Sequence, residues 1–238
     1  MMRHDAPDIG ILKTLDHPIW AALTTRQAHL GMGIGMARMY RAETAHFGTM
    51  GPAGVEDPAG LAALIADYPE GVVFMQADPI LTSAGFDIVD ATSGVQMMPT
   101  RKIDTMMSSG ICDLTAADVP EMMDLVTLTQ PGPFRRETHL MGGYFGVKSK
   151  GRLVAMAGER MKFPGFTEIS AVCVHPDYRG RGIARALTSH VAARISARGE
   201  VPFLHAFASN APAIALYESL GLAVRCMMHI ARLVPAER

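Results

Sequence analysis

The sequence predicts an α+β fold whose sheet lies mostly in the second half of the chain. Residues 115–141 show the apolar spacing of helices, and residues 144–161 read as a hairpin of two strands. Residues 168–233 then read as strand, helix, strand, helix and strand. Two helices followed by a hairpin and then alternating strands and helices is an element order typical of an α+β protein. The 238 residues are 49% hydrophobic, which is enough to bury a sizeable core.

Composition excludes several classes of protein. The formal net charge is −1, so no overall field attracts nucleic acid or an anionic membrane. The three cysteines are odd in number and widely spaced, which argues against a disulfide framework or a paired-cysteine metal site. The N-terminus lacks the apolar core of a signal peptide, and no run of about 18 apolar residues occurs. We therefore expect a cytoplasmic protein, monomeric or homodimeric, that binds no nucleic acid, membrane or metal.

The first half carries helix and strand signals but no motif to which chemistry can be assigned. Helices are expected at 19–30 and after Asp57, an N-cap followed by proline at the first helical position. The expected strands are 37–40, 47–50, 72–75 and 95–98. Residues 101–110 are polar and small, which is typical of a domain boundary. We predict an N-terminal α+β domain at 1–108 and a second domain at 109–238.

The second domain is expected to open with two helices. Thr115 and Asp118 have the spacing of a capping box, and apolar residues then repeat at helical spacing through residues 119–126. Pro131 ends this helix, and a short second helix is expected at 134–141.

The most informative stretch is 168–187. Residues 169–174 are apolar or small with little alternation, which suits a strand covered on both faces. Pro176 ends this strand, and an Arg-Gly-Arg-Gly loop at 179–182 leads directly into a helix. The free N–H groups at the start of a helix form a favourable binding site for phosphate.

The chain is then expected to finish with strand, helix and strand. A strand is predicted at 203–208, and Asn210 stands where the N-cap of the next helix belongs. That helix covers 211–220 and ends at Gly221, and residues 223–233 supply the last strand or strands.

Two of these segments carry a family resemblance. Residues 179–184 (RGRGIA) resemble the pyrophosphate loop of the GNAT (Gcn5-related N-acetyltransferase) superfamily, and a V-C-V-H-P strand end precedes them. Residues 210–222 are similar to that superfamily's N-x-x-A-x-x-x-Y-x-x-x-G-F segment. The resemblance covers roughly the second half of the chain and is closest to the FR47-like branch. It implies a three-layer α/β/α fold with a central, mixed, mostly antiparallel sheet. By length and element order, residues 1–108 are a candidate for a degenerate GNAT-like copy.

The resemblance also implies acetyl-CoA as cosubstrate and assigns residues to it. The loop would hold the pyrophosphate, with close backbone approach at its glycines. The strand at 172–174 would splay from 203–208 and hydrogen-bond the pantetheine arm, and Asn210 would contact the arm, a role compatible with capping. The expected cofactor-binding residues are Val172, Cys173, Val174, Arg179, Gly180, Arg181, Gly182, Ile183, Ala184 and Asn210.

Two residues are predicted to be catalytic. Tyr217 falls at the position of the superfamily's tyrosine general acid, and Glu168 at the offset of a catalytic glutamate in one of its branches. Glu159 or water alone is the alternative base. The amide of Val174 or a neighbour is expected to polarise the thioester carbonyl. Cys173 has no histidine near it in sequence and is not expected to be a nucleophile.

The favoured function is direct transfer of an acetyl group from acetyl-CoA to a primary amine of a small molecule or amino acid, or to a peptide N-terminus. A non-catalytic acyl-CoA-binding or sensing protein is the alternative. A nucleotide-binding module ranks last, because the glycine patterns of such modules are absent. Arg135 and Arg136 are candidates to meet a substrate carboxylate, or else lie at a solvated helix start. His139, His175 and His205 are expected to be structural or to line the pocket.

Overall fold

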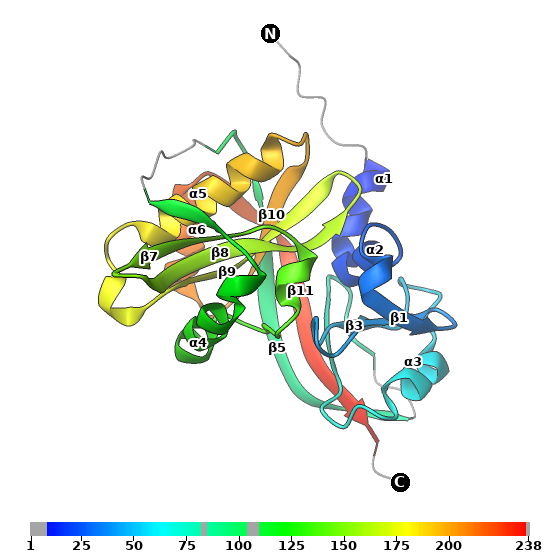
Figure 1. Cartoon of the computed structure of the whole chain (residues 1–238). Coiled ribbons are helices and arrows are strands. Elements are labelled where there is room, and N and C mark those ends of the chain that lie inside the picture. The colour runs from blue at the N-terminus through cyan, green and yellow to red at the C-terminus, as the bar shows by residue number, and fades with distance from the viewer. Residues whose placement is uncertain (1–8, 82–84, 104–109, 237–238) are drawn as a thin grey trace.

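The computed structural model describes residues 9–81, 85–103 and 110–236, and its centre is an eight-stranded sheet (Figure 1). The strands are β4 (Val72–Gln76), β5 (Phe86–Pro99), β6 (Ile111–Leu114), β7 (Tyr144–Ser149), β8 (Arg152–Phe163), β9 (Phe166–Val174), β10 (Val201–Phe207) and β11 (Leu222–Pro235). Their order in space is β4-β11-β5-β10-β9-β8-β7-β6. Among the described strands of this sheet only β9 and β10 pair in parallel, so the sheet is mixed and mostly antiparallel, as the family resemblance implies.

Helices cover both faces of the part of the sheet that holds β8 and β9. Helix α5 (Ile183–Ser196) packs its Leu187, Val191 and Ile195 onto one face. Helix α4 (Val119–Thr129) packs Met122 and Leu125 onto the other. Helix α6 (Ala211–Ser219) lies against β11. This arrangement gives the three expected layers and explains why β8 is buried along almost its whole length. Of the helices in the described residues, none has both the length and the apolar character that crossing a membrane requires.

The first part of the chain forms a smaller unit beside the sheet. It contains α1 (Ile9–Leu12), η1 (Lys13–Asp16), α2 (Pro18–Leu23), η2 (Ala28–Leu30), the three-stranded sheet β1 (Gly31–Ile34), β2 (Ala37–Tyr40) and β3 (Gly48–Thr49), and α3 (Pro58–Ile65). The helix predicted at 19–30 therefore ends at residue 23, and strand β1 begins at Gly31. The N-cap of α3 is as expected, because Asp57 Oδ1 accepts a hydrogen bond from Gly60 N at 2.8 Å.

The predicted boundary at residues 108 and 109 falls between strands of one sheet. Strands β4 and β5 come from the first part, and β5 lies between β10 and β11. The 14 residues of β11 have β5 on one side and β4 on the other, so both strand partners of β11 precede the boundary. The two-domain division and the degenerate-copy hypothesis stay predictions, but the units they define share a sheet.

A buried glutamine joins the two parts where strand β8 is irregular. The register between β8 and β9 shifts between Glu159 and Lys162, which interrupts the regular backbone pairing there. Gln27 Nε2 donates to Arg160 O at 2.7 Å and to Met141 O at 3.0 Å. Its Oε1 accepts from Lys162 N at 3.3 Å and from Tyr40 Oη at 2.6 Å. Gln27 thereby satisfies backbone groups that the bulge leaves unpaired.

Residues 109–238 produced alone should not fold. Strand β11 would lose both neighbours, and β10 would lose one, so long strand edges would stay unpaired. We expect the amide NMR spectrum of this fragment to lack the dispersion of the whole chain, whereas residues 9–238 should keep it. A fragment with native dispersion would show that the second half closes its sheet without β5.

Candidate active site

The site begins where the two parallel strands separate. Ile169 and Leu204 are the last paired residues of β9 and β10, although β9 continues to Val174 and β10 to Phe207. Beside the separation β9 bulges, and Ala171 has φ +52°, a left-handed value that costs a residue with a Cβ of order 1 kcal/mol or more. The separation leaves the edge of β9 that faces β10 without a paired strand, as the family resemblance implies.

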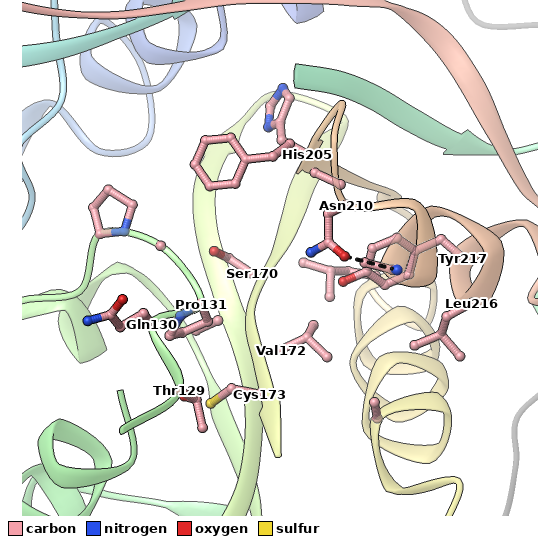
Figure 2. A pocket seen from close by; sticks show the side chains of 18 of the residues that line it. Thr129, Gln130, Pro131, Ser170, Val172, Cys173, His205, Asn210, Leu216 and Tyr217 are labelled. Atoms are coloured by element: carbon pink, nitrogen blue, oxygen red, sulfur yellow. Dashed lines mark hydrogen bonds between the residues drawn. The ribbon is translucent and has the colours of Figure 1, made fainter. Parts of the chain in front are cut away.

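A cavity of about 1060 Å³ occupies this gap (Figure 2). Ser170, Val172 and Cys173 lie on β9 at its centre, with Asn210 and Tyr217 of the α6 segment on one side. The loop after α4, at 129–133, lies on the other side. The predicted pantetheine contacts at 172–174 therefore all line one cavity. Burial raises the pKa of the Cys173 thiol to about 11, which keeps it protonated and argues against a nucleophilic role.

The arginine–glycine loop closes one end of the cavity. Gly180 and Gly182 have φ of +73° and +75°, so glycine is the residue that adopts this backbone without strain. Helix α5 then starts at Ile183 without a side-chain cap, which leaves its first amides available to an anion. Arg179, Gly180, Gly182, Ile183 and Ala184 line the cavity as expected.

The three arginines around this loop are not neutralised by carboxylates. Arg179 Nε donates to Val174 O at 3.3 Å, and Arg185 donates to Ser219. Arg181 does not line the cavity; it donates to Asp177 O at 2.9 Å, and its guanidinium lies over the ring of Tyr178. Within the described part of the chain none of the three forms a salt bridge, so this end of the cavity keeps a positive field.

Asn210 and Tyr217 lie where the sequence predicts. Asn210 Oδ1 accepts from Ala213 N at 3.2 Å and so caps α6. Seven residues later, the side chain of Tyr217 is nearly buried, with its hydroxyl directed into the cavity (Figure 2). Burial raises the pKa of Tyr217 to about 12, so the hydroxyl keeps its proton at neutral pH.

Glu168 is fully buried in an ion pair. Arg160 donates from Nε to Oε2 at 2.8 Å and from Nη2 to Oε1 at 2.6 Å. His205 Nδ1 lies 2.7 Å from Oε1, and Met161 N donates to Oε2 at 3.3 Å. Burial alone would raise the pKa of Glu168, but the charge and hydrogen bonds of Arg160 and His205 outweigh it and lower the pKa to about 2.

This environment does not suit the general base predicted at Glu168. A base needs a free lone pair and a pKa near neutrality, whereas this carboxylate is bonded on both oxygens and is not part of the cavity wall. Glu159 has a similar environment, paired with Lys162 Nζ at 2.5 Å and Arg198 Nη2 at 2.7 Å. Burial favours its neutral form, but these hydrogen bonds prevail and lower its pKa. Both assignments stay predictions for kinetics to test.

Sequence reasoning missed the opposite end of the cavity, which we call the acceptor end. Its walls come from distant segments: Phe47, Val73, Met75, Asp90, Thr92, Arg160, His205, Ile230 and Arg232. His205 lines this end as expected, with Nε2 at 3.0 Å from Gln96 Nε2 and Nδ1 on Glu168. A second hollow of about 560 Å³ shares Val73 and Arg232 with it and holds Arg135, whereas Arg136 lines neither. No local pattern in the sequence identifies these walls.

The substitution Glu168→Gln should destabilise the protein strongly at neutral pH. It leaves Arg160 buried without its carboxylate, and removing one partner of a buried pair costs about 3–5 kcal/mol. Glu70→Gln is the matched control, because Glu70 also pairs with an arginine but is 68% exposed, and exposed pairs contribute about 1 kcal/mol or less. Urea unfolding at pH 7 compares them, and equal losses would contradict the structure.

The pH dependence provides a second readout. A carboxyl whose pKa is lowered by folding stabilises the protein above its unfolded pKa, and this contribution disappears as pH falls toward the folded value. The native protein should therefore lose this contribution between about pH 4.5 and 2. Glu168→Gln should lack that part of the acid destabilisation, and Glu70→Gln should retain it.

Comparison with known proteins agrees with this geometry. The model of the FR47-like protein family matches residues 144–229, which run from β7 through the glycine loop and α6 into β11. The ribosomal protein bS18-alanine N-acetyltransferase of Escherichia coli K12 is 38% identical over 78 residues, 32% of this chain and 52% of that protein. The Salmonella typhimurium enzyme of the same name is 31% identical over 118 residues, 45% of this chain and 76% of that protein. The chain thus spans about half the length of the first relative and three quarters of the second.

A solved structure extends the likeness over nearly the whole chain. An acetyltransferase of the GNAT family from Novosphingobium aromaticivorans superposes with a TM-score of 0.84 at 36% identity, covering 94% of this chain and 99% of that one. The fold of this chain is a mixed sheet in which the parallel strands β9 and β10 separate next to the glycine loop. With these matches, the chain belongs to the GNAT family of acetyltransferases.

Proposed function

We propose that the protein is an acetyl-CoA-dependent N-acetyltransferase that moves the acetyl group directly to a primary amine. The observation that carries the proposal is one cavity with a phosphate-type loop at one end and a protonated tyrosine hydroxyl directed into it. The names of the curated relatives, which are N-acetyltransferases, support this activity.

Acetyl-CoA would enter with its pyrophosphate against the loop. The first amides of α5 and the unpaired arginines Arg179 and Arg185 are suited to the phosphates. The exposed edge of β9 at 172–174 would hydrogen-bond the pantetheine arm as an added strand does. Asn210, which faces the same cavity, would contact the arm while its Oδ1 caps the helix.

The chemistry is an aminolysis of the thioester. The lone pair of a neutral amine attacks the carbonyl carbon, a tetrahedral oxyanion forms, and the carbon–sulfur bond breaks to leave an amide and a thiolate. A backbone amide of β9 near Val174 would hydrogen-bond the oxyanion. Tyr217 would donate a proton to the leaving sulfur and recover it from solvent.

The amine must also lose a proton. Of the described residues that line this cavity, Asp90 alone carries a carboxylate, and it is 70% exposed and bonded to Arg232. We therefore favour loss of the proton through solvent, the water-only route among the expected alternatives. Glu168 would act by holding Arg160 in place.

Tyr217→Phe should lower kcat by about 10²-fold or more, because general acids contribute about 10² to 10⁴. The affinity for CoA should change little, since the ring stays. Tyr68→Phe is the matched control: its hydroxyl contacts Met32 outside the cavity, and its kcat should be unchanged. A thiol-release assay with acetyl-CoA and a panel of amines measures both. Tight CoA binding without acetylation of any amine would favour the sensing protein instead.

Gly182→Ala should weaken CoA binding. The alanine must adopt φ near +75° or distort the loop, at a cost of about 1 kcal/mol or more. Gly199→Ala is the matched control, because Gly199 has φ +78°, lies beyond the far end of α5, and also has free space around the added Cβ. Both variants should lose similar stability in thermal unfolding. Only Gly182→Ala should raise the CoA dissociation constant in calorimetry, and equal constants would place the phosphates elsewhere.

A further inference from the structure

We infer that the acceptor is an α-amino amide with an uncharged, apolar body, and that the free nitrogen of Arg160 recognises the carbonyl next to its amine. The inference rests on the proposed function, since it concerns the second substrate of the same cavity. It is carried by three observations: the apolar wall, the balance of charge, and the hydrogen bonds that Arg160 leaves unused.

One part of the wall of the acceptor end is apolar, and most of this part comes from the first 100 residues. Phe47, Val73 and Met75 line it from the segments around β3 and β4. Ile230 faces them from β11, and Phe207 stands at the end of β10 with 44% of its surface exposed. An apolar side chain on the acceptor would therefore be favoured by burial here.

The cations of the acceptor end are each matched by a carboxylate. Arg160 pairs with Glu168 at 2.6 Å, and Arg232 pairs with Asp90 at 2.7 Å. In the adjoining hollow Arg135 pairs with Glu70 at 2.7 Å. His46, beside that pair, has its pKa lowered by burial and by Arg135, which favours the neutral imidazole.

This balance of charge argues against acceptors that carry a charged group in addition to the reacting amine. Among the described residues of the acceptor end, the carboxylate of a free amino acid would meet no unpaired cation, and the cations of a polyamine would meet no unpaired carboxylate. Either would lose hydration without compensation, and removing an ion from water is costly unless it is paired. An acceptor whose only ionisable group is the reacting amine avoids this cost.

Arg160 supplies the polar contact that fixes the carbonyl. Nε and Nη2 of Arg160 are bonded to Glu168, while Nη1 has no hydrogen bond to any other described residue. The side chain keeps 11% of its surface exposed, at the cavity wall. Phe47 lies over the guanidinium at 4.8 Å, and Gln27 holds the backbone carbonyl of the same residue. A fixed single donor of this kind can hydrogen-bond a carbonyl oxygen, and the preference for a neutral group comes from the balance of charge around it.

The test uses four amines, three of which share one apolar body: phenylalanine amide, phenethylamine, phenylalanine and spermidine. Acetyl transfer by the full chain is measured as kcat/KM, corrected for the neutral fraction of each amine. We expect phenylalanine amide to exceed phenethylamine about tenfold, the effect of one hydrogen bond to a charged donor. It should exceed phenylalanine and spermidine at least about 100-fold.

Two variants probe the two parts of the inference separately. Arg160→Lys keeps a cation for Glu168 but removes the free guanidinium nitrogen, so the preference for the amide over phenethylamine should vanish. Asp90→Asn releases Arg232 at an exposed position, so it should fold normally and raise activity on phenylalanine relative to the amide at least about fivefold. If Arg160→Lys does not fold, two other measurements still test the inference. These are the activity of Asp90→Asn on phenylalanine relative to phenylalanine amide, and the order in which the native protein prefers the four amines.

The outcomes are distinguishable. Phenylalanine or spermidine acetylated as well as the amide would overturn the inference and leave the acetyltransferase proposal standing. The inference would also be overturned if Asp90→Asn did not change the ratio of kcat/KM for phenylalanine to kcat/KM for phenylalanine amide. Binding of CoA with none of these amines and no amine of a wider panel acetylated would overturn the proposed function itself.

Discussion

The site depends on the point at which two parallel strands stop pairing. Beyond Ile169 and Leu204, β9 and β10 separate, and the bulge with left-handed Ala171 lies on the side of β9 that faces β8. The separation creates the cavity and frees the backbone edge that lines it. It also directs the end of β9 toward the glycine loop and the end of β10 toward Asn210, so one backbone feature brings together the segments that we propose bind the cofactor.

The separation of β9 and β10 removes backbone hydrogen bonds from the middle of the sheet, and buried polar side chains beside it link the strands instead. Glu168 on β9 binds Arg160 on β8 and His205 on β10, and His205 contacts Gln96 on β5. Gln96 in turn accepts a hydrogen bond from Arg225 on β11 at 2.5 Å. This chain of hydrogen bonds ties five strands together beside the separation. Because each member satisfies the next, loss of one would leave others buried without a partner.

The first part of the chain completes this arrangement. Its strand β5 fills the place between β10 and β11, Gln27 satisfies the bulged backbone of β8, and Phe47 lies against Arg160. The predicted 109–238 unit contains the groups suited to acetyl-CoA, whereas the acceptor end depends on residues from both parts. The first part supplies some of the cavity wall and strands of the sheet, and neither contribution leaves a local chemical motif in the sequence.

Local signals made the glycine loop and the α6 segment predictable. Glycines with positive φ, an N-cap asparagine and a tyrosine two turns later are properties of short segments, and the structure places them along one cavity, whose lining does not include Arg181. The partner of Glu168 was not predictable, because Arg160 reaches it only through the irregular register of β8 and β9. The insertion of β5 is a pairing across more than 100 residues, and alternation along a strand does not reveal its neighbours.

We propose that acetyl-CoA binds in the gap between β9 and β10. Hydrogen–deuterium exchange of the full chain with and without CoA tests this binding site most directly. We expect slower exchange at 170–174 and 180–185, and no change in strands β1 to β3 at 31–49. Protection of the loop without protection of β9, or protection confined to the second hollow, would contradict the claim.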